Sequence, residues 1–245
     1  MRVPRSRVTI PSDLRVVGVA IPAAGSGVRM GGRRKPFLTL AGRPLLAHTL
    51  QPFLDHPQVT CLVVALSPAD VADAPGWLRA LDARIRIVAG GETRRDSVHA
   101  AVEALDASVN WVLVHDAARP LVTRSIIDRC IDVAGGEEGV VTAWPIGDTL
   151  KEVASDRTVL GTPDRSRLWG AQTPQAFPRD RLVAAYRKAI DEDFLATDDA
   201  EVYGRFGGVT RVVEGSRWNL KVTHPEDLVV AEHLCAHPGV LEGRG

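Results

Sequence analysis

Short apolar runs that alternate with segments of helical character are the sequence feature that most restricts this fold. The runs occupy residues 16–21, 61–66, 85–88, 111–114 and 139–143. Continuous apolar runs of this length are typical of strands buried on both faces of a parallel sheet. Between them we predict helices at residues 45–54, about 69–81, 97–105 and 124–134, the last with Thr123 as its N-cap. Alternating strands and helices form right-handed βαβ units, so the sequence predicts an α/β fold: an open, mostly parallel, Rossmann-like sheet with helices on both faces.

A segment after Pro145 interrupts this alternation. Residues 148–153 and 158–161 flank a polar turn at residues 154–157, which predicts a protruding β-hairpin arm. Two short strands bury little surface by themselves, so we expect the arm to pack on a partner subunit in a homodimer. The α/β pattern then resumes, with helices near residues 179–191 and 198–206, a strand at 210–213 and a helix from Pro225 to about residue 236.

The length and composition indicate one principal domain. A chain of 245 residues, 45% of them hydrophobic, can bury one substantial core. We predict disordered tails at residues 1–14 and 237–245 and one domain at 15–236, with the arm at about 146–168. The chain contains no run of about 18 apolar residues for a membrane span and no signal-peptide core near its start. Three scattered cysteines fit a reducing cytoplasm better than a disulfide framework or a zinc site.

The charges of the chain limit the kind of partner that it binds. Thirty basic side chains balance thirty acidic ones, which argues against nucleic acid as a partner, so any phosphate binding should be local. Four of the basic residues are lysines, and this scarcity makes the position of each one informative: Lys35, Lys151, Lys188 and Lys221.

The first predicted strand leads into a turn of small residues. These are Pro22, Ala23, Ala24, Gly25, Ser26 and Gly27. Small side chains let backbone N–H groups reach phosphate oxygens. The turn is not a P-loop, because no Lys-Ser or Lys-Thr closes it, and Met30 stands where a dinucleotide loop has its third glycine. An ordinary βα connection is the alternative, but the cations Arg29 and Lys35 follow closely and favour a triphosphate site.

The turn and six later motifs together resemble a known family. The motifs occupy residues 90–98, 115–120, 148–151, 172–175, 197–200 and 219–228 and occur in order. Over roughly residues 15–236, the chain resembles the 2-C-methyl-D-erythritol 4-phosphate cytidylyltransferases, which are sugar-phosphate nucleotidyltransferases of the non-mevalonate isoprenoid pathway. The resemblance implies that the chain binds CTP and a sugar-alcohol phosphate, uses Mg²⁺ and releases pyrophosphate.

The resemblance also implies which residues bind the nucleotide. Arg29 and Lys35 correspond to the catalytic cations that contact the triphosphate and stabilise the charge on its α-phosphoryl group. Gly91, Glu92 and Ser97 correspond to the segment that reads the cytosine ring, and Arg94 supports this segment. Ser97 is open to a second, compatible interpretation, as a residue that opens the next helix.

The remaining implied residues bind the second substrate and the metal. Asp116 corresponds to an aspartate near the ribose, the substrate and Mg²⁺, although an aspartate that caps the next turn is an alternative. Lys221 corresponds to the lysine that holds the attacking phosphate. Thr149 and Arg165 correspond to substrate-binding residues that the arm contributes across the dimer. Thr197 corresponds to a threonine near the substrate, but Thr197 with Asp198 is also an ordinary helix start.

Two alternative functions stay open at this point. The first is a cytidylyltransferase for another polyol phosphate, such as ribitol 5-phosphate. The second is a non-catalytic nucleotide-binding module, which the combination of Arg29, Lys35, Asp116 and Lys221 disfavours.

Overall fold

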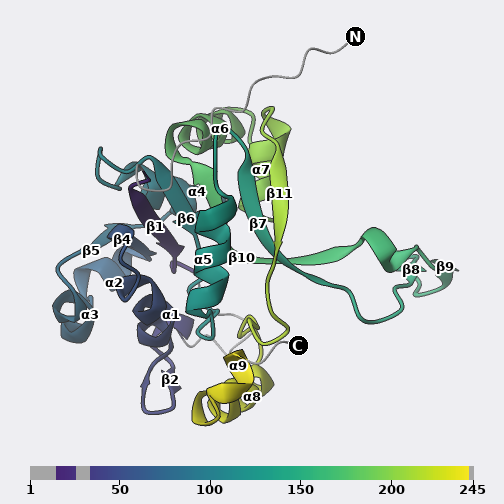
Figure 1. Cartoon of the computed structure of the whole chain (residues 1–245), viewed down its shortest axis with the longest axis horizontal. Helices are drawn as coiled ribbons and strands as arrows, with labels where there is room; N and C mark the ends of the chain where they lie inside the picture. Colours follow the sequence, from purple (N-terminus) through teal and green to yellow (C-terminus); the bar gives the residue numbers. More distant parts are fainter. Residues whose placement is uncertain (1–14, 26–33, 243–245) are drawn as a thin grey trace.

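A seven-stranded sheet forms the centre of the protein (Figure 1). The structure, a computed structural model, describes residues 15–25 and 34–242. The strand order is β11-β7-β10-β6-β1-β4-β5. The strands are β1 (Val17–Pro22), β4 (Val59–Leu66), β5 (Ile85–Ala89), β6 (Trp111–Val114), β7 (Gly139–Pro145), β10 (Trp169–Pro178) and β11 (Thr210–Glu214). β10 runs antiparallel to β6 and β7, and the other pairs are parallel, which confirms the predicted α/β fold.

Both faces of the sheet are covered, which explains why its strands are continuous apolar runs. In β4, Leu62, Val64 and Leu66 belong to a core cluster with α1 (Leu45–Leu54) and α5 (Arg124–Val133). The alternate β4 residues belong to a second cluster with α4 (Arg94–Glu103), α6 (Arg179–Asp191) and α7 (Asp199–Arg205). Because successive side chains of a strand point to opposite faces, every β4 position from Cys61 to Leu66 is buried and apolar.

The strand order reverses beside β1, and this reversal locates the functional site. From β1 the chain proceeds to β4 and β5 on one side and then returns to form β6 on the other side. In open α/β sheets, ligands bind at such a reversal, beyond the carboxyl ends of the strands. The segments that follow β1, β5 and β6 meet at this edge.

Several elements differ from the sequence-based expectation. The helix expected at 69–81 is two helices, α2 (Pro68–Ala72) and α3 (Gly76–Leu81), because Pro75 forms the N-cap of a new helix. α4 begins three residues earlier than expected, because Thr93 and Asp96 form a capping box. The tail at 237–245 was expected to be disordered throughout, but it contains the short helix α9 (Gly239–Glu242).

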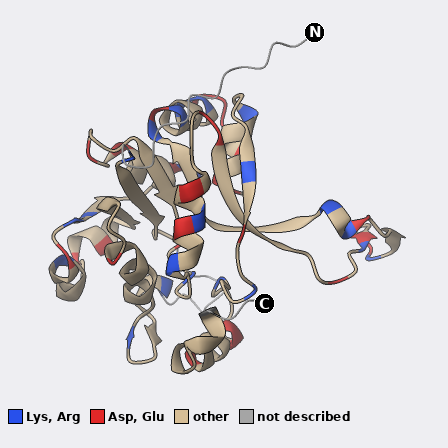
Figure 2. Ribbon diagram, viewed as in Figure 1, with Lys and Arg blue, Asp and Glu red and all other residues tan. Residues whose placement is uncertain are grey.

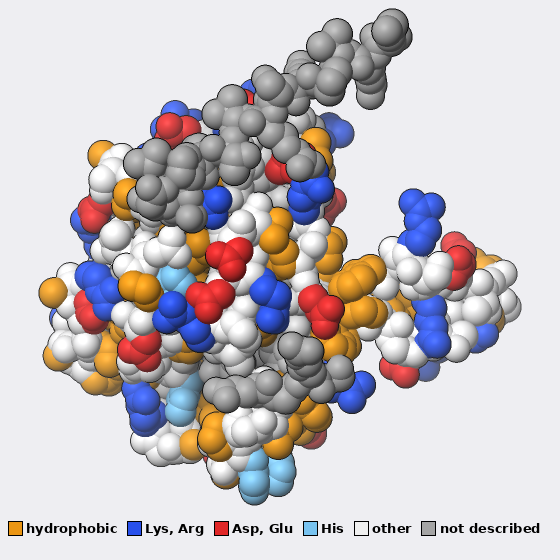
Figure 3. Space-filling view, viewed as in Figure 1, with side chains coloured by type: hydrophobic (Ala, Val, Ile, Leu, Met, Phe, Trp, Pro, Cys, Tyr) orange, Lys and Arg blue, Asp and Glu red, His pale blue; other side chains and the backbone are white. Residues whose placement is uncertain are grey.

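The hairpin arm is present, with strands shorter than predicted. β8 (Glu152–Val153) and β9 (Val159–Gly161) form its tip, which extends away from the body of the molecule (Figure 1). Charges of both signs are spread over the body and the arm (Figure 2). Hydrophobic side chains gather where the arm joins the body (Figure 3). The exposed large hydrophobic residues of the arm and its base are Val153, Val159, Leu160, Leu168 and Trp169.

A small third cluster fixes the segments on the other side of the site. It joins α8 (Pro225–Ala236) to the hairpin β2 (Thr39–Leu40) and β3 (Arg43–Pro44) through Leu40, Val222 and Leu234. The hairpin follows the 3-10 helix η3 (Lys35–Phe37), and α8 follows Lys221, so this cluster anchors the segments that carry both lysines. Within residues 15–25 and 34–242, no helix has the length and apolar character to cross a membrane.

Candidate active site

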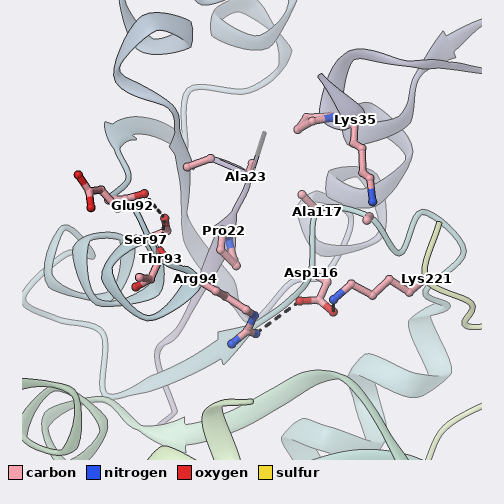
Figure 4. A pocket seen from close by; sticks show the side chains of 15 residues that line it. Pro22, Ala23, Lys35, Glu92, Thr93, Arg94, Ser97, Asp116, Ala117 and Lys221 are labelled. Atoms are coloured by element: carbon pink, nitrogen blue, oxygen red, sulfur yellow. Dashed lines mark hydrogen bonds and ion pairs between the residues drawn. The ribbon is translucent and has the colours of Figure 1, made fainter. Parts of the chain in front are cut away.

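A cavity of about 430 Å³, called here the first cavity, opens at the reversal of the strand order (Figure 4). Its walls come from the turn after β1, from η3, from the loop after β5 with the start of α4, from the loop after β6, and from the segment before α8. The predicted site residues that line it are Pro22, Ala23, Ala24, Gly25, Lys35, Gly91, Glu92, Arg94, Ser97, Asp116 and Lys221. Segments from five parts of the chain thus converge on one cavity.

Two glycines allow the loop after β5 to pack closely around this cavity. A Cβ atom at Gly90 would lie 2.8 Å from both the Ala24 Cβ and the Ser97 Oγ. A Cβ atom at Gly91 would lie 2.4 Å from the Asp96 Cβ. Both separations are too short for real atoms, so only glycine permits this packing. Backbone groups therefore form much of this wall.

Ser97 lies in the first turn of α4 and is 3% exposed. Its hydroxyl lies 3.0 Å from the Thr93 carbonyl and 3.3 Å from the Gly91 carbonyl. Thr93 opens the helix, since its side chain accepts from the Asp96 N–H. The interpretation of Ser97 as the helix-opening residue is therefore wrong. Its hydroxyl instead ties the glycine loop to the helix.

Asp116 is the electrostatic centre of the site (Figure 4). Its side chain is 9% exposed, and its Oδ2 lies 3.0 Å from Lys221 Nζ and 3.3 Å from Arg119 Nε. Its Oδ1 lies 3.4 Å from Arg94 Nη2. Burial alone would raise the pKa of this carboxyl, but the charges of Arg94, Lys221 and Arg119 outweigh it and hold the pKa well below its usual range. Asp116 is therefore ionised, and its carboxylate binds three cations.

His115 supports Asp116 from the core. The imidazole is fully buried, and burial lowers its pKa to about 4. Its Nε2 lies 3.2 Å from the Arg119 carbonyl, which can only accept, so Nε2 carries the proton and Nδ1 accepts from the Thr173 hydroxyl at 3.0 Å. The Thr173 oxygen in turn accepts from the Asp116 N–H at 3.0 Å. A neutral histidine and a threonine thus fix the backbone of Asp116.

A second cavity, of about 240 Å³, adjoins the first one at Asp116 and the cations that contact it. Arg94, Asp116 and Lys221 line both cavities and so form a shared wall. Thr197 lines the second cavity, and its role in substrate binding stays a prediction. Its remaining walls are Arg119, Ala171, Gln172, Thr173, Gln175 and Asp198. Two adjoining cavities with charged groups between them suit a reaction between two phosphorylated substrates.

Some predicted site residues lie elsewhere. Thr149 and Arg165 are on the arm and line neither cavity. Arg165 donates to the Gly147 carbonyl at the base of the arm. The predictions for Ser26, Gly27 and Arg29 lie outside the described residues.

Sequence reasoning missed two side chains that shape the site. Arg119 stands within the motif at 115–120, three residues after Asp116, and this spacing was the available signal. Gln172 stands within the motif at 172–175, but its local sequence contains no sign of its contact with Asn219.

The residues present fit a magnesium ion held jointly with a phosphorylated ligand. Among residues 15–25 and 34–242, no group of three or more histidine, cysteine, aspartate or glutamate side chains could hold a metal ion by itself. Magnesium commonly uses one or two carboxylates together with substrate phosphates. Asp116 is ionised, lines the first cavity, and has one 3.4 Å contact at Oδ1, so a lone pair of this oxygen remains for a cation.

Comparisons with known proteins agree on one family. The family model described as 2-C-methyl-D-erythritol 4-phosphate cytidylyltransferase matches residues 17–237. The protein of that name from Symbiobacterium thermophilum is 45% identical over 89% of this chain and 92% of its own length. Its counterpart from Synechococcus elongatus is 40% identical over 86% and 93%.

Solved structures give the same result. The 4-diphosphocytidyl-2C-methyl-D-erythritol synthase from Anaerococcus prevotii superimposes with a TM-score of 0.81 at 30% identity, covering 91% of this chain and 97% of that one. The cytidylyltransferase structure from Thermus thermophilus gives a TM-score of 0.77 at 34% identity, covering 91% and 99%.

Proposed function

The chain belongs to the 2-C-methyl-D-erythritol 4-phosphate cytidylyltransferase family, and from this premise we propose how its residues carry out the reaction. The enzyme is a nucleotidyltransferase of the non-mevalonate isoprenoid pathway. It transfers CMP from CTP to 2-C-methyl-D-erythritol 4-phosphate and gives 4-diphosphocytidyl-2-C-methyl-D-erythritol and pyrophosphate. The observation that carries the residue assignments is the shared wall of Arg94, Asp116 and Lys221 between the two cavities.

CTP occupies the first cavity in this proposal. The turn of small residues after β1 offers backbone N–H groups to the triphosphate, and Lys35 neutralises its charge. The same role for Arg29 stays a prediction from the sequence. The cytosine ring faces Gly91, Glu92 and Ser97. Because buried hydrogen-bonding groups left unpaired are costly, this loop rejects bases with a different pattern of donors and acceptors.

The polyol phosphate occupies the second cavity, beside Thr197. Its phosphate oxygen attacks the α-phosphorus of CTP in line, the new P–O bond forms, and the bond to pyrophosphate breaks. Lys221 lies on the shared wall and holds the attacking phosphate near the α-phosphorus. Phosphoryl transfer is catalysed chiefly by positioning and charge neutralisation, so no covalent enzyme intermediate is required.

Asp116 would be the protein ligand of a magnesium ion in this proposal. When bound, the ion would supply positive charge to the triphosphate oxygens.

The arm supplies the last substrate contacts, through a homodimer. Thr149 and Arg165 lie on the arm and line neither cavity of their own chain, so we assign them to the second cavity of the partner subunit. The exposed Val159, Leu160 and Trp169 support this arrangement, since apolar surface on a narrow arm favours a partner. A cytoplasmic location stays a prediction from the composition; in the structure all three cysteines are free.

Replacement of Lys35 by alanine tests the assignment of the triphosphate site. We expect Lys35→Ala to lose nearly all CTP-dependent pyrophosphate release while its circular dichroism and thermal unfolding stay close to those of the parent. Lys188→Ala is the matched control, because Lys188 is exposed on α6 and lines neither cavity. Parental activity in Lys35→Ala would remove Lys35 from the catalytic set.

A further inference from the structure

A buried carboxylate beneath the shared wall has no role in the mechanism described above. Asp199 is the first residue of α7 and is 0% exposed. It accepts two hydrogen bonds from the Arg94 guanidinium, from Nη1 at 3.0 Å and from Nη2 at 2.7 Å. This bidentate pair joins two helices that are 105 residues apart in the sequence. Such a pair fixes the plane of the guanidinium as well as its position.

Tyr186 holds the same carboxylate from a third helix. Its hydroxyl, on α6, donates to Asp199 Oδ1, and its side chain is 1% exposed. Burial and the charge of Asp199 raise the pKa of Tyr186 well above its usual value, so the hydroxyl stays a donor. Asp199 is therefore held by a tyrosine on one side and by an arginine on the other.

The start of α7 is itself fixed to the sheet. Gln175 of β10 donates to Asp198 Oδ2 at 3.0 Å and accepts from the Ala200 N–H at 3.0 Å. These two bonds flank Asp199 in the sequence. The carboxylate thus stands on a rigid support.

Arg94 carries this constraint to the reacting groups. Its Nη2, already bonded to Asp199, lies 3.4 Å from Asp116 Oδ1. Arg94 and Asp116 line both cavities, whereas Asp199 and Tyr186 line neither. Arg94 is therefore the side chain through which Asp199 contacts the shared wall.

The energetics argue that this carboxylate is more than a stabilising contact. Burying an ion pair costs desolvation energy that the attraction barely offsets, and apolar side chains of similar size often stabilise a fold equally well. A buried, fully bonded acid beside the site is better explained by the direction that it gives to Arg94.

We propose that Asp199 and Tyr186 are positioning residues that aim the Arg94 guanidinium at Asp116. Without them, Arg94 is free to turn toward the first cavity or to close fully on Asp116, and Asp116 loses its fixed orientation between the two substrates. This inference rests on the proposed function, because it assigns Asp116 to the reaction.

The test is a double-mutant cycle between Asp199 and Arg94. Asp199→Asn keeps the size of the side chain and removes its charge. We expect kcat to fall about 10- to 100-fold, while the KM values for CTP and for 2-C-methyl-D-erythritol 4-phosphate change less than about threefold. In an Arg94→Gln background the same substitution should change kcat by less than about twofold, because the guanidinium that Asp199 positions is already absent. A purely structural role would instead lower Tm and leave kcat of the folded enzyme unchanged, or would give effects on kcat that add in the double variant. Either result would overturn the proposal.

Tyr186→Phe gives a second test should Asp199→Asn fold poorly. It removes one buried hydroxyl, and we expect kcat to fall several-fold in the parent but not with Arg94→Gln. Tyr203→Phe is the matched control: Tyr203 is also a buried tyrosine, and its hydroxyl donates to the Glu137 carbonyl away from both cavities. It should lower Tm without changing kcat. Equal kcat in Tyr186→Phe and Tyr203→Phe would refute the proposal for Tyr186. An inactive parent enzyme would instead contradict the proposed function, so the two failures are distinguishable.

Discussion

Acidification from pH 7 to pH 4 is expected to destabilise this protein through His115. The imidazole is fully buried, and burial lowers its pKa from an ordinary value of 6.5 to about 4. In this pH range the histidine of the unfolded chain binds a proton, whereas the histidine of the folded chain does not. Protons therefore favour the unfolded state, and the free energy of unfolding falls as the pH decreases.

The size of the effect follows from the two pKa values. Each tenfold difference in proton affinity corresponds to about 1.4 kcal/mol, so a decrease from 6.5 to about 4 corresponds to a loss of about 3 kcal/mol. The loss begins below pH 6.5 and is nearly complete near pH 4. Carboxylates whose pKa is lowered in the fold, such as Asp116, begin to lose their contribution as the pH falls through the pKa of the unfolded chain, 3.8 for an aspartate, so most of their titration lies in a lower window.

The measurement is urea unfolding at a series of pH values for the parent and for His115→Asn, which cannot take up the proton. The variant should be less stable at pH 7, because it loses the bond to the Arg119 carbonyl, but its stability should fall less between pH 7 and pH 4. Between pH 7 and pH 4 the free energy of unfolding of the parent should fall by about 3 kcal/mol more than that of the variant. His56, whose pKa burial also lowers, is present in both proteins and so cancels. Parallel stability curves for the two proteins would refute the reasoning.

Three further substitutions separate binding, catalysis and stability. Gly91→Ala places a Cβ 2.4 Å from the Asp96 Cβ, so the loop must shift at a cost of about 1–3 kcal/mol. In steady-state assays the KM for CTP should therefore rise more than the KM for the polyol phosphate. Equal changes in the two KM values would contradict the assignment of the first cavity to CTP. Lys221→Met keeps the length of a side chain that is 40% exposed but removes the charge 3.0 Å from Asp116. We expect kcat/KM to fall at least about 100-fold, while Tm stays within about 2 °C of the parent. Near-parental turnover would exclude Lys221 from the reaction. Arg84→Met removes the hydrogen bonds to the Leu54 and Val59 carbonyls, and none of these residues lines either cavity. Calorimetry should therefore find a Tm several degrees lower, while kcat is unchanged. A lower kcat would mean that this region affects the site.

The sequence predicts the regular part of the fold well, because local patterns determine it. The predicted helices at 45–54, 179–191 and 225–236 match α1, α6 and α8. β10 could not be found in this way. Its sequence contains Gly170, Gln172 and Pro174 rather than an apolar run, and it becomes a strand because β6 and β7 supply apolar neighbours and hydrogen bonds on both sides.

The site is predictable where it follows from the ends of strands. Residues after β1, β5 and β6 meet because parallel strands end at the same edge, so Ala23, Gly91 and Asp116 could be placed together. The role of Asp199 could not be predicted from the sequence, because it depends on a contact with Arg94 across 105 residues and on the packing of three helices. Neighbouring residues in the sequence carry no sign of such a contact.

We propose that the two cavities bind CTP and 2-C-methyl-D-erythritol 4-phosphate for direct transfer of CMP. The most direct measurement is pyrophosphate release by the purified protein with Mg²⁺, using each of the four ribonucleoside triphosphates paired with 2-C-methyl-D-erythritol 4-phosphate or with ribitol 5-phosphate. We expect rapid release for CTP with 2-C-methyl-D-erythritol 4-phosphate and at most slow release for every other pair. Faster release with ribitol 5-phosphate or with another triphosphate, or no release from any pair, would contradict it.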